Sequence, residues 1–116
     1  MIRLNAAASA RQPTEEAVKI AFIVHIEYHT ERVLEIFKAV DIDYYTRWEQ
    51  AMGKGHHTEP HLGRGGYPSL NGVLMIGFED EAPLAALIRE IEATNAAIAR
   101  RADHIRLFQV PLERIV

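Results

Sequence analysis

Residues 20–28 read IAFIVHIEY, and this stretch decides the fold class because it predicts a largely buried strand. Its side chains are mostly β-branched or aromatic, which favours an extended backbone. Phe22 and Val24 alternate with Ile23 and His25, so apolar groups fall on both faces of the expected strand. An ordered domain is therefore expected to begin just before this stretch.

A helix is expected directly after this strand. Thr30 is the expected N-cap, and Glu31 would place negative charge at the positive end of the helix dipole. The helix should end near residue 40. The apolar residues that would share its buried face are Val33, Leu34, Phe37 and Val40.

Three more strands and a second helix complete the expected pattern. The strands are expected at residues 43–52, 73–78 and 105–110, and the helix at residues 82–99. The order β-α-β-β-α-β is the split β-α-β arrangement, an α+β ferredoxin-like fold. It predicts a four-stranded antiparallel sheet with two helices on one face. Because the first and third strands are apolar on both sides, the helix-free face should also be buried, most simply against other copies of the chain.

Composition limits the protein class. With 116 residues, 48% of them apolar and 25% charged, the chain fits one globular domain, expected at residues 18–116. Residues 1–17 are expected to form a flexible leader. A formal charge of -3 argues against a nucleic-acid surface, and no apolar run is long enough for membrane insertion. The absence of cysteine excludes disulfides and thiolate metal sites and fits a cytoplasmic location.

A long connection at residues 53–72 carries most of the chemistry. It is rich in glycine and contains Pro60 and Pro68, so no regular element is expected there. Connections this long inside a small domain often carry function. Anion binding, metal binding and catalysis are the three hypotheses for it.

The anion hypothesis combines glycines with basic side chains. The glycines let backbone N–H groups approach a phosphate, and Lys54 and Arg64 supply charged donors. A second basic group after the expected second helix could reach the same ligand across a subunit boundary. Its members are Arg100, Arg101 and Arg106.

The metal hypothesis depends on His56, His57 and His61, with Glu59 between them. Three imidazoles and a carboxylate suit zinc, nickel or copper.

Catalysis is the weakest hypothesis, because no nucleophile and base are held at a fixed spacing. His25 and His29 are assigned no role, since a strand histidine is more often a hydrogen-bonded structural residue. We therefore expect a protein that is not an enzyme.

The long connection and the segment after it resemble the PII-like signalling superfamily. Residues 54–59 (KGHHTE) resemble that family's Lys-Gly-His-Thr-Glu with one inserted histidine, and residues 64–67 (RGGY) are similar to its Arg-Gly-Ala-Glu-Tyr segment. Asp103 and residues 106–110 look like the end of its nucleotide-binding B-loop and the following strand. The expected element order also matches.

The resemblance implies a homotrimer that binds an adenine nucleotide in each cleft between subunits. Residues 53–72 would be the T-loop, which changes conformation to control a partner protein such as a transporter or an enzyme. No catalysis is implied. The residues that would bind nucleotide are Gly53, Lys54 and Gly55 at the base of the T-loop, Arg64 of the Arg-Gly segment, and Arg106, which would face the phosphates. Arg101 and Arg114 are added by charge and approximate placement.

Departures from the family pattern narrow the expected function. Residues 98–103 (IARRAD) replace the glycine-rich B-loop, which favours ADP or AMP over magnesium-bound ATP. Gly53 replaces a glutamine of the nitrogen-regulatory members, which weakens 2-oxoglutarate sensing. These departures point to a divergent PII-like branch. One such branch is associated with carboxysomes and inorganic-carbon uptake, and this chain would resemble it as a sensor of ADP or AMP together with bicarbonate. The alternative is a trimeric heavy-metal-binding or cation-tolerance protein that uses His56, His57 and His61.

Overall fold

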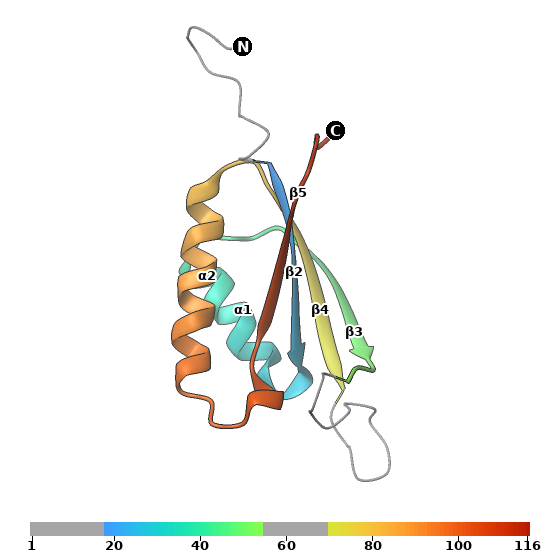
Figure 1. The fold of residues 1–116 in the computed structure, drawn as a ribbon, viewed down its shortest axis with the longest axis vertical. Coiled ribbons are helices and arrows are strands. Elements are labelled where there is room, and N and C mark those ends of the chain that lie inside the picture. The colour runs from blue at the N-terminus through green and yellow to red at the C-terminus, as the bar shows by residue number, and fades with distance from the viewer. Residues whose placement is uncertain (1–17, 55–69) are drawn as a thin grey trace, which may run out of the picture.

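The computed structural model describes residues 18–54 and 70–116, and these form two layers, a sheet and a pair of helices (Figure 1). The predicted element order is confirmed. In chain order the elements are β2 (Lys19–Ile26), a 3-10 turn η2 (Glu27–His29), α1 (Thr30–Ala39), β3 (Thr46–Ala51), β4 (Asn71–Phe78), α2 (Glu81–Ala96), a 3-10 turn η3 (Arg101–Asp103) and β5 (Arg106–Pro111).

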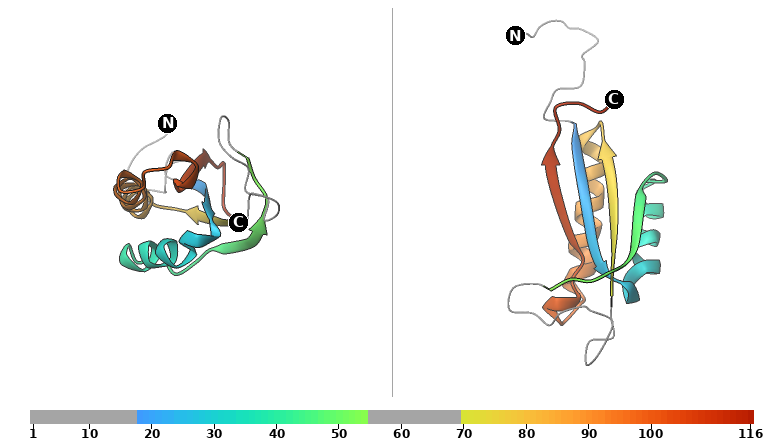
Figure 2. Two further views of the ribbon diagram at one scale, coloured as in Figure 1. Left: turned by 90° about the horizontal axis from the view of Figure 1, so that it is seen from below. Right: turned by 90° about the vertical axis from the view of Figure 1, so that its right-hand side faces the viewer.

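The four strands form one antiparallel sheet in the order β3-β4-β2-β5. β2 lies between β4 and β5, and Phe22 stands opposite Met75 on one side and Phe108 on the other. Both helices cover the same face of this sheet (Figure 2). The predicted α+β ferredoxin-like fold is therefore confirmed.

The core lies between the helices and the sheet. Alternate residues of the central strands, such as Ala21 and Ile23 of β2, are completely buried there, because side chains on a strand alternate between faces. α1 contributes Val33, Ile36 and Phe37, and α2 contributes Leu84, Leu87 and Ile91. Neither helix in the described part of the chain is long and apolar enough to cross a bilayer.

The face of the sheet that the helices do not cover is also apolar. We call it the open sheet face. Trp48 and Phe108 on it are 48% and 56% exposed, while the residues of the central strands are half-buried. Its members, placed by strand register, are Ile20, Phe22, Val24, Trp48, Val73, Met75, Phe108 and Val110. The prediction that the central strands are apolar on both faces is thus confirmed.

The start of α1 differs from the prediction. The expected strand 20–28 ends at Ile26, because residues 27–29 turn the chain into the helix, and Tyr28 is 82% exposed. The expected Thr30 cap is wrong. Thr30 is the first residue of α1, its backbone N–H donates to Glu27 O, and no side chain caps the helix.

The starts of β3 and β4 differ from the predicted strand boundaries. β3 starts at Thr46 instead of residue 43, since the Tyr44 and Tyr45 rings pack edge-on against Phe78 and Phe37. β4 starts at Asn71 instead of residue 73, so the last two residues of the expected loop are paired with β2.

The end of α2 also comes earlier than expected. The helix ends at Ala96 instead of residue 99, and β5 begins at Arg106 instead of residue 105. The Asn95 side-chain amide donates to Ile105 O at 2.7 Å, and its carbonyl oxygen accepts from Ile105 N–H at 2.8 Å. This amide ties the last turn of the helix to the start of β5.

Candidate functional site

Several predicted site residues lie at one end of the sheet, where β2 ends and β5 begins (Figure 1). Arg106 stands opposite Val24, so it lies on the open sheet face and is exposed to solvent. Gly53 lies beside Asn71 at the start of β4, and a Cβ on Gly53 would come within 2.5 Å of the Asn71 amide nitrogen. Lys54 follows directly.

Arg101 lies in η3, which also precedes β5 at this end of the sheet. Its neighbour Arg100 forms a 3.9 Å ion pair with Asp103. The segment at residues 98–103 therefore ends in a short 3-10 turn that begins with a basic residue. Arg101, Lys54 and Arg106 thus bring positive charge to the end of the sheet that carries the long connection.

Of the remaining predicted residues, the structure describes Arg114, and it is not brought to this group. Arg114 follows β5 at the opposite end of the sheet within the chain, where Leu112 N–H bonds Val18 O. Five others lie outside the described residues, namely Gly55, His56, His57, His61 and Arg64. Within residues 18–54 and 70–116, no group of three or more potential ligands could hold a metal ion.

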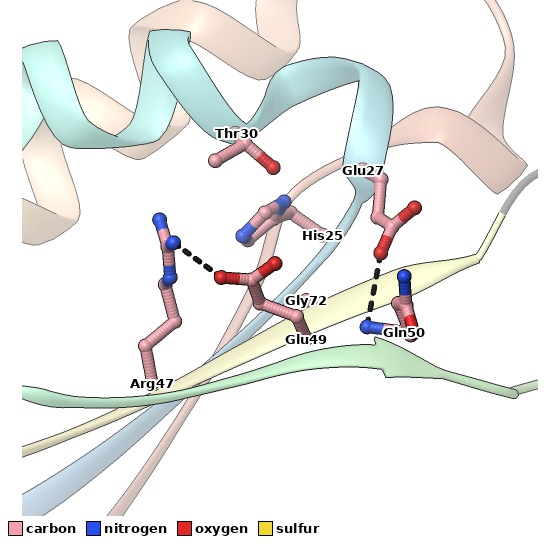
Figure 3. A pocket seen from close by; sticks show the side chains of 7 residues that line it. All are labelled: His25, Glu27, Thr30, Arg47, Glu49, Gln50 and Gly72. Carbon is pink, nitrogen blue, oxygen red and sulfur yellow. Dashed lines mark hydrogen bonds and ion pairs between the residues drawn. The ribbon is translucent and has the colours of Figure 1, made fainter.

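A pocket of about 250 Å³ lies on the helix side of the same end of the sheet (Figure 3). It opens between the first turn of α1 and the edge strand β3. Polar and charged side chains line it, which makes it unlike the core. The lining residues are His25, Glu27, Thr30, Arg47, Glu49, Gln50 and Gly72.

An irregularity in β3 shapes one wall of this pocket. The register between β3 and β4 shifts between Trp48 and Ala51, and Gln50 has a left-handed backbone with φ of 60°. This conformation is uncommon for a residue with a side chain. It lets Gln50 N–H leave the sheet and donate to Glu27 Oε2 at 2.9 Å. The bulge therefore ties β3 to η2 across the pocket.

His25 forms the buried inner wall. Only 2% of the surface of His25 is exposed, and its Nδ1 lies 2.8 Å from Ile26 O. Because a carbonyl only accepts, Nδ1 carries the proton in the neutral ring and Nε2 keeps its lone pair. Nε2 is buried without a hydrogen-bond partner. Burial lowers the pKa of His25, although the bond to Ile26 O opposes the change.

No protein-family model matches the sequence, and no curated protein is significantly similar to it. Solved structures do match the fold. CPII, a nitrogen regulatory PII-like protein from Thiomonas intermedia K12 bound to ADP, AMP and bicarbonate, superposes with a TM-score of 0.58. The two are 15% identical, over 85% of this chain and 96% of that chain. This chain has a PII-like fold.

Two further CPII structures agree with this assignment. The form bound to ADP and bicarbonate gives a TM-score of 0.60 at 15% identity, covering 84% of this chain and 89% of the other. The apo form gives 0.52 at 10% identity, covering 84% and 94%. The resemblance seen in the sequence is therefore confirmed at the level of the fold.

The sequence prediction did not find the pocket beside α1. Arg47 and Glu49 are two residues apart on a strand, which puts them on one face and could have signalled a polar patch. Their ion pair has a 2.5 Å separation between a guanidinium nitrogen and Glu49 Oε2. Nothing in the residue pattern showed that Gly72 would meet His25.

Gly72→Ala is expected to lower the free energy of unfolding by about 1–3 kcal/mol, the usual range for overpacking. A Cβ at Gly72 would lie 2.8 Å from His25 Cε1 and Nε2, so the ring would have to move. Urea unfolding measures the change. Gly77→Ala on the same strand is the matched control, because its Cβ would lie 3.4 Å from the nearest atom, Ile115 Cδ1. Equal effects of the two substitutions would contradict this packing account.

The free energy of unfolding should fall as the pH is lowered from about 7.5 to about 5. Burial lowers the pKa of both His25 and His29 below 6.5, so the unfolded chain binds protons that the folded chain does not. The stabilising contribution is complete above the unfolded pKa and is lost as the pH falls toward the folded pKa. In urea unfolding, the stability of the His25→Asn variant should depend less steeply on pH than that of the unmodified protein. An unchanged slope would argue against a contribution from His25.

Proposed function

We propose that this chain is a regulatory protein that senses an adenine nucleotide in clefts between subunits. The observation that supports this most is the position of Arg106, a solvent-exposed cation on the open sheet face. It lies at the same end of the sheet as Lys54 and η3. A ligand phosphate bound there would meet charged donors from three segments.

The proposed assembly is a homotrimer. The open sheet face carries apolar side chains that a second copy could cover, and Arg106 lies beside Phe108 on this face. Contact between copies would then place Arg106 near a subunit boundary. Covering apolar surface is the main favourable contribution to such association.

The proposed nucleotide is ADP or AMP, and a small anion such as bicarbonate is the proposed second effector. CPII, which has the same fold, is bound to these ligands in its solved structures. In this chain residues 98–103 supply arginines instead of a glycine-rich loop, which suits a nucleotide bound without magnesium. The proposed role is signalling through residues 53–72 to a partner protein, a transporter or an enzyme, without catalysis.

Calorimetric titration with ADP, AMP and magnesium-ATP, each with and without bicarbonate, tests this proposal. ADP or AMP should bind and should raise the unfolding temperature, since a ligand that binds only the folded state stabilises it. Magnesium-ATP should bind more weakly. Absence of binding heat for all three nucleotides at millimolar concentration would overturn the proposal.

A further inference from the structure

The pocket beside α1 lies on the opposite face of the sheet from Arg106. His25 lies on the same face of β2 as the core residues Ala21 and Ile23, so it faces the helices, while Arg106 and Val24 face the other way. The sheet itself separates the two sites. A ligand of this pocket is therefore distinct from the proposed nucleotide.

His25 Nε2 requires a hydrogen-bond donor. A polar atom that is buried without a partner destabilises the folded chain. In the neutral ring this atom can only accept, because Nδ1 donates to Ile26 O. Figure 3 shows the imidazole between Thr30 of α1 and Glu49 of β3. A ligand that satisfies Nε2 must bring an N–H or O–H group of its own.

The charges around the ring favour a cation. Glu27 and Glu49 contribute two carboxylates, and Arg47 contributes one guanidinium that is already paired with Glu49. With the ring neutral, the lining carries a net negative charge. An anion such as bicarbonate would be repelled, whereas a positively charged N–H donor would be attracted.

The size of the pocket limits the ligand. Its volume of about 250 Å³ exceeds the roughly 30 Å³ share of one water molecule, yet it is at the small end for ligand sites. Gly72 lets the ring lie against β4, because a Cβ there would come within 2.8 Å of His25 Cε1 and Nε2. The Glu49 side chain is 61% exposed, so it can move to admit a small group to Nε2.

We propose that this pocket binds a small protonated amine, ammonium or a primary alkylammonium. One N–H of the ligand donates to His25 Nε2, and another donates to the Glu49 carboxylate. The Thr30 hydroxyl, on the α1 side of the pocket, is a third acceptor. The proposal does not depend on nucleotide binding, because the two sites use different residues on different faces.

Nuclear magnetic resonance of the imidazole nitrogens in the full-length protein tests the proposal. Titration with methylammonium should shift the His25 Nε2 resonance in a saturable way, with a dissociation constant in the millimolar range. Tetramethylammonium has the same charge but no N–H, and bicarbonate has the opposite charge, so neither should shift this resonance. An equal response to tetramethylammonium, a response to bicarbonate instead, or no saturable response to methylammonium would overturn the proposal.

Two variants sharpen the test. Glu49→Gln removes an exposed carboxylate and should weaken methylammonium binding severalfold, whereas Glu113→Gln makes the same charge change at a remote exposed position and should not. Equal affinity in Glu49→Gln and the unmodified protein would count against the site. Nucleotide calorimetry on the same samples reports separately on the proposed function, so failure of one result is distinguishable from failure of the other.

Discussion

The Phe108→Glu variant is expected to sediment as a single chain of 13.1 kDa, whereas the unmodified protein should sediment at three times that mass. Phe108 is 56% exposed and stands opposite Phe22 on the open sheet face, in the edge strand β5. If copies of the chain cover this face, the substitution removes a large apolar contact and buries a carboxylate in each subunit. Burying an unpaired charge costs several kcal/mol, so a trimer should dissociate at micromolar concentration.

Tyr28→Glu is the matched control for this prediction. Tyr28 is also an exposed aromatic residue, at 82%, but it lies in η2 and outside the open sheet face. This variant should keep the mass of the unmodified protein. A monomeric unmodified protein, or the same mass for Phe108→Glu as for the unmodified protein, would contradict the assembly proposed here.

Arg106→Glu is expected to weaken ADP binding by roughly tenfold to a hundredfold or more. A hydrogen bond to a charged group contributes about 1.5–3 kcal/mol, and reversal of the charge adds repulsion of the phosphates. Arg106 is exposed at the start of β5, so the fold should tolerate the substitution. Calorimetry gives the affinity, and circular dichroism checks that the fold is retained.

The control for Arg106 is Arg89→Glu, which makes the same charge change on the exposed side of α2. Its ADP affinity should match that of the unmodified protein. Unchanged ADP affinity in Arg106→Glu would remove Arg106 from the nucleotide site. An equal loss in both variants would indicate an effect of net charge rather than of a specific contact.

The sequence predicted the fold well because the core follows simple periodicities. The alternation of residues 20–26 and the helical spacing of Leu84, Leu87 and Ile91 each describe one buried face. The errors occurred where a residue served a tertiary contact. Tyr44 and Tyr45 looked like strand residues, yet their rings pack against core phenylalanines before the strand begins.

The candidate site was only partly predictable for the same reason. The basic residues Lys54, Arg101 and Arg106 were found from their charge and motif, and the fold does bring them to one end of the sheet. The pocket depends instead on the β3 bulge, where Gln50 takes a left-handed backbone, and on Gly72 pairing with His25. Strand register sets both features, and composition does not report it.

A crystal structure of the chain grown with ADP would show whether the nucleotide binds between subunits at Arg106. ADP is expected in a cleft between two chains, with phosphate oxygens within hydrogen-bond distance of Arg106 and with the open sheet faces packed together. ADP bound to one chain away from Arg106, or open sheet faces left in solvent, would contradict this expectation.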